Sequence, residues 1–321
     1  MLKHLPVTQP ILLENETILT GLNIAYHQYG ELLPNKKVLW VAHALTADSD
    51  VMQWWSGLFG NEKTFSEAKY CIICPNNLGS CYGTSVINNN DQPLQLTVRD
   101  MVQVHSLLAT ALSITTIEVA IGGSQGGQLL IEWNIQNPQL FKNVILLATN
   151  AKHSAWGIAF NEAQRMAILA DNSTAKHSGL AAARAIAMLS YRSYYQMVTV
   201  QTDNDSLQFE KRKAVTYLQY QGKKLAKRFT WQSYLTLSYA MDSHDVARGR
   251  LSEADALNEI TARVAVIGIN HDILFPSCEQ QHLANLISNA TYYEIASDYG
   301  HDGFLTETVS IQKVIKQFLN F

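Results

Sequence analysis

Short apolar runs rich in β-branched residues recur along the chain, and each ends in residues typical of turns. The six runs are Lys37–Ala42, Tyr70–Pro75, Thr116–Ile121, Val144–Ala148, Arg263–Ile269 and Thr291–Ile295. Between several of them, apolar residues repeat at helical spacing, as in Asp100–Leu108 and Gly127–Asn137. Strands that alternate with helices predict an α/β fold, with a mostly parallel sheet covered by helices on both faces.

The segment from about 151 to 260 interrupts this alternation. We find no strand-like run bounded by turns in it, and we expect five helices instead. They are Ala155–Asp171, Ser178–Val198, Ser206–Leu225, Thr230–Met241 and Ser252–Ile260. We therefore interpret residues 1–150 and 261–321 as one α/β core, and residues 151–260 as an inserted helical cap.

The composition narrows the class of protein. Of 321 residues, 47% are apolar and 16% are charged, which excludes a disordered chain and allows a large core. The 24 basic and 27 acidic residues leave no basic surface suited to nucleic acid or to an anionic membrane. The apolar runs are too short to span a membrane, and the first residues do not resemble a signal peptide. We therefore expect a soluble cytoplasmic protein.

Two of the four cysteines, Cys71 and Cys74, form a C-x-x-C pair that can indicate a metal or redox site. The pair lies within a predicted buried strand, where residues three apart point to opposite faces of the sheet. The two thiols therefore cannot share a ligand, and no second cysteine pair completes a zinc site. We expect buried core cysteines and no metal.

The strongest local signal is the G-x-S-x-G motif centred on Ser124, between a predicted strand and a predicted helix. This is the context of a nucleophile elbow, in which the serine occupies a sharp turn and its neighbours two residues away must lack side chains. The turn also places Ser124 at the N-terminal end of a helix, where a developing oxyanion is stabilised. A glycine-rich turn with an incidental serine has the same pattern. Whether Ser124 is catalytic therefore depends on whether an acid and a histidine follow it in the expected places.

An acid and a histidine follow the last two predicted strands, in the chain order that α/β-hydrolases require. They are Asp272 and His301, and both lie where the sites of open parallel sheets form. We predict that Ser124 is the nucleophile, His301 the general base and Asp272 the acid that orients it. His271 and Asp298 are the neighbouring competitors for the last two roles.

An oxyanion hole requires two backbone N–H groups. One belongs to the residue after the nucleophile, which is Gln125. The other comes from the loop after an earlier strand, here 43–46. We choose Leu45 as the second donor, with Ala44 as the alternative.

With these residues in place, the sequence resembles the homoserine O-acetyltransferase family. The resemblance rests on the order of several short blocks and covers about residues 35 to 310. The blocks are His43-Ala44-Leu45-Thr46, Trp54-Trp55, Asn76–Gly83, Thr97–Met101, Gly122–Gly127, Asn161–Arg165, Tyr217–Gly222, Met241–Val246 and Gly300–Phe304. Each block alone is weak, whereas the ordered set is highly specific.

The resemblance implies ping-pong acyl transfer in methionine biosynthesis, with no metal and no bound prosthetic group. Ser124 would take the acetyl group from acetyl-CoA and pass it to the side-chain hydroxyl of L-homoserine. The cap would exclude water, the competing nucleophile, and the family typically forms homodimers through the cap. The expected partners are therefore these small molecules and a second copy of the chain, with no nucleic acid and no membrane.

The resemblance also aligns Arg184 with the residue that binds the substrate carboxylate, and Asp302 with the residue that receives its ammonium group. Arg184 shares one helix face with Met188 and Tyr191, at positions i, i+4 and i+7. Its planar guanidinium suits a carboxylate, although an arginine that reaches from a buried helix to solvent would fit the same pattern.

Other readings remain open at the level of the sequence. Gln125 stands where the family more often has methionine or another apolar residue, although only its backbone N–H is required. Succinyl-CoA could replace acetyl-CoA, and serine could replace homoserine. An esterase with the same triad, or a binding protein without activity, would have the same α/β fold, because the fold alone does not determine function.

Overall fold

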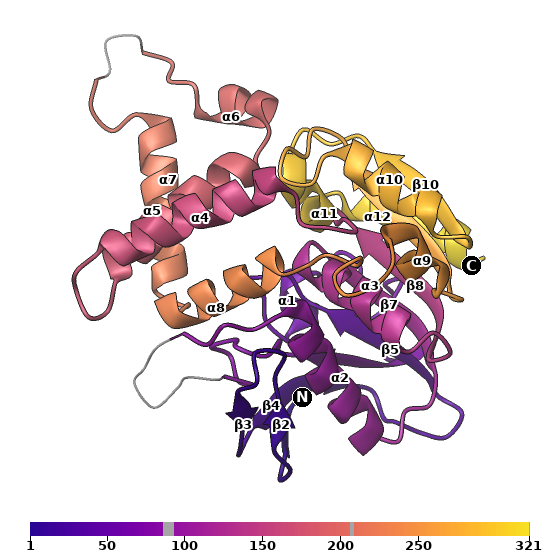
Figure 1. Cartoon of the computed structure of the whole chain (residues 1–321). Coiled ribbons are helices and arrows are strands. Elements are labelled where there is room, and N and C mark those ends of the chain that lie inside the picture. Colours follow the sequence, from indigo (N-terminus) through magenta and orange to yellow (C-terminus); the bar gives the residue numbers. More distant parts are fainter. Residues whose placement is uncertain (86–92, 206–208, 321) are drawn as a thin grey trace.

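An eight-stranded sheet forms the centre of the computed structural model, which describes residues 1–85, 93–205 and 209–320 (Figure 1). The strand order is β1-β4-β6-β5-β7-β8-β9-β10. The bounds are β1 (Leu2–Pro6), β4 (Asn23–Tyr29), β5 (Lys37–Ala42), β6 (Tyr70–Pro75), β7 (Ile117–Gly123), β8 (Phe141–Leu147), β9 (Arg263–Ile269) and β10 (Ala290–Ile295). The strands from β6 to β10 are parallel, whereas β1 and β4 pair antiparallel at one edge.

The α/β fold and its six predicted strands are confirmed. β5, β6 and β9 have the predicted bounds, while β7 continues to Gly123 and β8 begins earlier, at Phe141. The apolar pattern of the sequence does not predict β1 and β4, nor the separate pair β2 (Ile11–Leu12) and β3 (Ile18–Leu19). β1 lies at the edge of the sheet and none of its residues is fully buried. It therefore does not need the long apolar run that identifies the central strands, and its sequence has none.

Helices cover both faces of the sheet. One core packs α2 (Val98–Ala111), α3 (Gln125–Gln136) and α10 (Ser277–Leu286) against the sheet, and the other packs α1 (Val51–Trp54), α11 (Gly303–Thr306) and α12 (Thr308–Leu319). Cys71 belongs to the first core and Cys74 to the second, and both are buried. The prediction that these two thiols point to opposite faces is confirmed.

A group of helices lies beside the sheet rather than on its faces (Figure 1). The group comprises α4 (Ala155–Ala170), α5 (His177–Tyr191), α6 (Tyr194–Gln201), α7 (Lys213–Ala226) and α8 (Trp231–Asp242), and we call these five helices the cap. The next helix, α9 (Glu253–Asn258), falls within the predicted insertion but packs against α10 of the core.

Two predicted helix bounds in the cap are wrong. The expected helix Ser178–Val198 is divided into α5 and α6, because the Ser193 side chain caps α6 by accepting from the N–H of Gln196 at 3.1 Å. The Ser193 hydroxyl also donates to the carbonyl of Asp298 in the core, which fixes the break against the end of β10. The expected helix from Ser206 begins only at Lys213, and residues 206–208 of that prediction lie outside the described residues.

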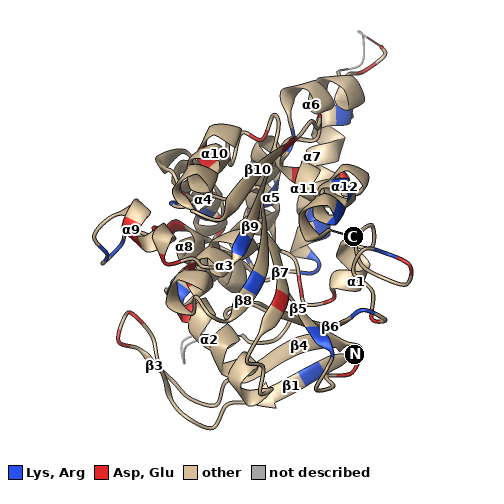
Figure 2. Cartoon of the chain, turned by 90° about the vertical axis from the view of Figure 1, so that its right-hand side faces the viewer, with Lys and Arg blue, Asp and Glu red and all other residues tan. Residues whose placement is uncertain are grey.

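Charged residues are sparse and of mixed sign on the face seen in Figure 2. Within the described residues, every helix is too short or too polar to cross a membrane.

Candidate active site

Ser124 lies in the sharp turn that joins β7 to α3. Its backbone has φ 55° and ψ −127°, in the left-handed half of the map that non-glycine residues seldom adopt. A Cβ on Gly122 would lie 2.6 Å from the carbonyl oxygen of Gly126, and a Cβ on Gly126 would lie 2.1 Å from that of Ala42. The two motif glycines are therefore required by the close approach of strand, turn and helix.

The structure brings Ser124, His301 and Asp272 into one hydrogen-bonded series. His301 Nε2 lies 3.1 Å from Ser124 Oγ, and His301 Nδ1 lies 2.7 Å from Asp272 Oδ2. The other carboxylate oxygen of Asp272 accepts from the backbone N–H groups of Leu274 and Phe275, each at 2.9 Å. Because the carboxylate only accepts, Nδ1 carries the proton of a neutral imidazole, which leaves Nε2 free to accept from the serine.

Aromatic rings fix the orientation of the His301 side chain. Its ring centroid lies 5.2 Å from that of Phe275, 5.2 Å from that of Phe304 and 5.5 Å from that of Tyr191. His301 itself is 3% exposed. The imidazole is therefore packed from three sides and directed at Ser124.

The competing pair lies elsewhere. His271 Nδ1 is 3.9 Å from Asp298 Oδ1, and the two side chains are 40% and 78% exposed. The His271 ring packs against Tyr195 at 5.0 Å between centroids. The structure thus brings Asp272 and His301 to Ser124 and leaves His271 and Asp298 paired with each other at the surface.

The loop after β5, which contains Leu45 and its alternative Ala44, is held by a buried histidine. His43 Nδ1 donates to the Ala44 carbonyl at 2.9 Å, and His43 Nε2 accepts from the N–H of Asn77 at 2.9 Å. The Asn77 side chain also donates to the His43 carbonyl at 3.2 Å. Burial lowers the pKa of His43, which keeps the ring neutral with one donor and one acceptor. Sequence reasoning gave His43 no role, although a histidine directly after a buried strand was the available signal.

Gln125, the other predicted oxyanion donor, is the first residue of α3, so its N–H has no acceptor within that helix. Its side chain is buried, and Nε2 donates to the carbonyl of Leu237 in α8 at 2.7 Å. The residue that departs from the expected methionine therefore ties the serine turn to the cap.

Ser124 and His301 open into a pocket of about 440 Å³. The loop after β5, cap helices α5 and α7 and the segment after β10 contribute its walls. Leu45, Arg184 and Asp302 also line this pocket. Apart from Asp272, every residue predicted to act through its side chain therefore lines the same pocket.

The two predicted substrate-binding residues have different surroundings. The Arg184 guanidinium lies 5.1 Å from the ring centroid of Tyr191, and its Nη1 is buried without a partner among the described residues. Asp302 Oδ2 lies 3.1 Å from Arg192 Nε. Burial raises the pKa of Asp302, and the positive charges of Arg192 and Arg184 oppose that shift. Arg192 was missed by sequence reasoning, because it reaches Asp302 only through the break after α5.

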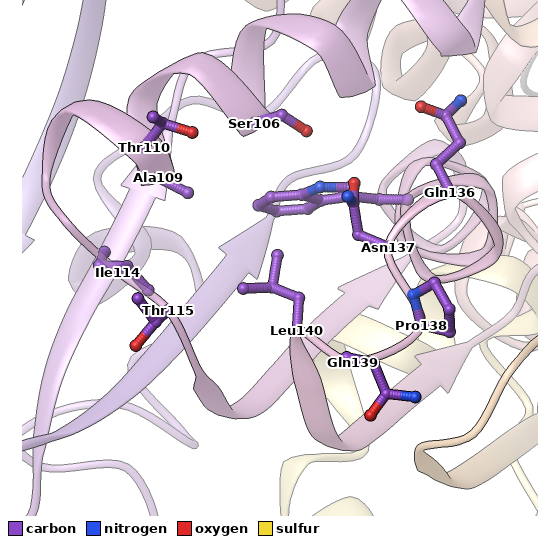
Figure 3. A pocket seen from close by; sticks show the side chains of 11 residues that line it. Ser106, Ala109, Thr110, Ile114, Thr115, Gln136, Asn137, Pro138, Gln139 and Leu140 are labelled. Carbon is purple, nitrogen blue, oxygen red and sulfur yellow. The ribbon is translucent and has the colours of Figure 1, made fainter.

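A second cavity, of about 420 Å³, lies at the other end of α3, among the last residues of α2 and α3 and the loop before β8 (Figure 3). None of the described residues that line it is ionisable. Nor do the described residues include a cluster of three or more His, Cys, Asp or Glu side chains arranged to hold a metal ion. The pocket at Ser124 is therefore the candidate active site.

Comparisons with known proteins agree with this fold. The model of the alpha/beta hydrolase fold family matches residues 37–308. The chain is 40% identical to homoserine O-acetyltransferase of Chlorobium chlorochromatii, over 97% of this chain and 93% of the relative. It is 43% identical to the enzyme of that name from Cyclobacterium marinum, over 95% and 92%.

A solved structure has the same fold. The crystal structure of homoserine O-acetyltransferase from Staphylococcus aureus superposes with a TM-score of 0.86 at 27% identity. The match covers 100% of this chain and 95% of that one, so the cap is included as well as the core.

Proposed function

The chain belongs to the homoserine O-acetyltransferase family, and on that premise we propose that it transfers the acetyl group of acetyl-CoA to the side-chain hydroxyl of L-homoserine, in methionine biosynthesis. The observation that supports this proposal best is the hydrogen-bonded series from Asp272 through His301 to Ser124, at a pocket that also contains Arg184 and Asp302.

In the first half-reaction, His301 takes the hydroxyl proton of Ser124 while Oγ attacks the thioester carbon. The N–H groups of Leu45 and Gln125 stabilise the negative oxygen of the tetrahedral intermediate. The carbon–sulfur bond then breaks, and CoA leaves as a thiol with the proton from His301. Asp272 stays ionised throughout and stabilises the imidazolium.

In the second half-reaction, His301 takes the proton of the homoserine hydroxyl, and that oxygen attacks the acetyl carbon on Ser124. The ester bond to Ser124 breaks, and its oxygen recovers the proton. Arg184 binds the carboxylate of the acceptor, for which its unpaired buried Nη1 is suited, and Asp302 binds the ammonium group. No metal or bound prosthetic group takes part in either step.

The cap has two proposed roles. Its helices reduce the access of water to the acyl-enzyme, because water would otherwise compete with homoserine. It also joins two copies of the chain, since α5 and α6 expose Leu189, Tyr194, Tyr195 and Val198 to solvent. Sedimentation velocity should give about twice the chain mass of 35.8 kDa, and a single-chain mass at micromolar concentration would reject the pairing.

Trapping of the acyl-enzyme tests the proposed function. Brief incubation with acetyl-CoA alone should add one acetyl group to Ser124, which mass spectrometry of the intact protein and its peptides detects. The Ser124→Ala variant should acquire no acetyl group and should have no transferase activity. An acetyl group on another residue, or an active Ser124→Ala variant, would reject the nucleophile.

A substrate panel tests the choice of donor and acceptor. The panel combines acetyl-CoA or succinyl-CoA with homoserine, serine or water. We expect the fastest turnover with acetyl-CoA and homoserine. Full-rate release of CoA without an amino acid would instead identify a thioester hydrolase.

A further inference from the structure

A group of positive side chains lies at the C-terminal end of α7, beside the candidate active site. The segment 222–229 contains Lys223, Lys224, Lys227 and Arg228. Only Lys224 and Arg228 of these four line the pocket that contains Ser124. Their spacing of four residues places both on one side of the helix end, whereas Lys223 lines a separate cavity between α5 and α7.

Arg228 is fixed at the rim of the pocket. Its Nη1 donates to the carbonyl of Thr46 at 2.8 Å and to the hydroxyl of Tyr82 at 2.6 Å. Both bonds use the same nitrogen of a group that has five N–H donors. The guanidinium is therefore anchored beside the loop after β5, with its other nitrogens able to bind a further acceptor.

Lys224 is exposed and has no carboxylate partner among the residues that the structure describes. The acidic residues that line the same pocket are Asp48 and Asp302. Asp302 is already paired with Arg192, and one oxygen of Asp48 accepts from the N–H of Asp50 at 2.8 Å. With Arg184 included, three cations line this pocket, and its two acids do not balance them.

The proposed reaction explains only one of these cations. The acceptor has a single carboxylate, which is assigned to Arg184, and the thioester itself is uncharged. The remaining negative charges on the substrates are the phosphate groups of CoA. Favourable interaction with the helix dipole accounts for lysines in the last turn of α7, but it does not require two cations to face the pocket.

We propose that Lys224 and Arg228 bind the phosphate groups of the acyl-CoA donor and hold its thioester at Ser124. This assignment rests on the proposed function, because it assumes an acyl-CoA donor. Arginine and lysine are the residues that most often bind phosphate, and the anchored guanidinium adds a fixed direction to the contact.

The test compares two donors and two matched variants. Acetyl-CoA carries the phosphates, whereas S-acetyl-N-acetylcysteamine is a truncated thioester without them. Lys224→Gln removes a charge that lines the pocket, and Lys223→Gln removes the neighbouring charge that does not. The quantity measured is the ratio of kcat/KM for acetyl-CoA to kcat/KM for the truncated donor, with homoserine as acceptor.

We expect Lys224→Gln to lower this ratio about tenfold, through a higher KM for acetyl-CoA, and Lys223→Gln to keep the wild-type ratio. An equal loss with both donors would place Lys224 at the reacting atoms and overturn the proposal. If both variants lowered the ratio equally, the cause would be the general positive charge of this helix end, and the proposal would again be overturned. Failure of the wild-type protein to use either thioester would reject the proposed function itself.

Discussion

Arg184 and Asp302 differ in what already binds them. The unpaired Nη1 of Arg184 is buried, and such a donor is costly unless a ligand satisfies it. Asp302 already has an ion pair with Arg192, so an ammonium group would join an occupied carboxylate. At the residue scale, Arg184 therefore has the stronger case for a direct substrate contact.

We predict that Arg184→Lys lowers kcat/KM for homoserine roughly 10- to 100-fold, because lysine cannot reproduce a bidentate contact with a carboxylate. Acylation of Ser124 by acetyl-CoA should be largely unaffected. Rapid-quench measurement of the acylation burst, set against steady-state transfer, separates the two half-reactions. Arg263→Lys, at the start of β9 and outside the pocket, is the control for the substitution itself.

Asp302→Asn should likewise weaken transfer to homoserine and spare the acylation burst. Burial raises the pKa of Asp302, so the carboxylate takes up its proton at a higher pH than an ordinary aspartate. The KM for homoserine should therefore rise as the pH falls into the mildly acidic range, and this rise should be absent in Asp302→Asn. Equal loss in both half-reactions would mean that these two residues maintain the site and do not select the acceptor.

The residues that form the triad were predictable because each follows a recognisable strand, and the chain order of the three is diagnostic. The side-chain contacts around them were not. Arg192 reaches Asp302, and Gln125 reaches Leu237 in α8, through contacts between segments far apart in sequence. No local pattern encodes such a contact, which depends on how the cap meets the core.

At the scale of elements, a buried polar network joins two cap helices. Asp242, the last residue of α8, accepts from Arg165 Nη1 and from Asn161 Nδ2 of α4, each at 2.7 Å. Arg165 is 3% exposed and also pairs with Glu162 of its own helix at 2.8 Å, so Asp242 is the carboxylate that joins it to α8. The network fixes α8, the helix whose Leu237 carbonyl binds the Gln125 side chain.

We predict that Asp242→Asn loosens the cap and raises acceptor-independent hydrolysis of acetyl-CoA several-fold relative to transfer, because water reaches the acyl-enzyme more often. The control is Asp245→Asn, which makes the same substitution in an ion pair with the exposed Lys152, worth about 0–1 kcal/mol. Parallel assays of CoA release and O-acetylhomoserine formation give the ratio. An unchanged ratio in an Asp242→Asn protein with a lowered melting temperature would show that α8 is not the barrier to water.

Helix positions were predictable from apolar spacing, but helix ends were less so. The break after α5 depends on a side-chain cap at Ser193 and on its bond to the Asp298 carbonyl. Apolar residues continue on both sides of this point, so the pattern alone favoured one helix. A tertiary contact with the core decided the outcome, and it is this break that places Arg192 beside Asp302.

At the scale of the whole molecule, the parallel strands were predictable because both of their faces are buried and their apolar runs are continuous. The antiparallel edge was not, since β1 presents one face to solvent and β2 and β3 have two residues each. Tertiary pairing, and not local composition, defines those strands.

Buried histidines, His43 among them, make the stability of the fold dependent on pH. Burial lowers the pKa of His105 to about 3, of His153 to about 3 and of His244 to about 4. Each ring has an ordinary pKa near 6.5 in the unfolded chain, so the unfolded state binds more protons below that pH. The stabilising effect of the neutral rings is therefore nearly complete above pH 6.5 and is lost progressively as the pH falls to between 4 and 3. Asp302 has a raised pKa, so at this group the folded state binds up to one more proton than the unfolded state, which opposes the loss of stability.

We predict that the free energy of unfolding falls by at least about 3 kcal/mol between pH 6.5 and 5.5, since His105, His153 and His244 each contribute about 1 kcal/mol over that interval and His43, whose pKa burial also lowers, adds to the fall. Urea unfolding at the two pH values measures the difference. His105→Gln removes one ring and retains an acceptor for the Trp40 indole, which donates to His105 Nδ1 at 3.1 Å. Whatever its absolute stability, this variant should lose about 1 kcal/mol less than the wild type over the same interval. An unchanged pH dependence in His105→Gln would mean that the ring is protonated in the folded protein, in conflict with its complete burial between Trp40 and Trp133.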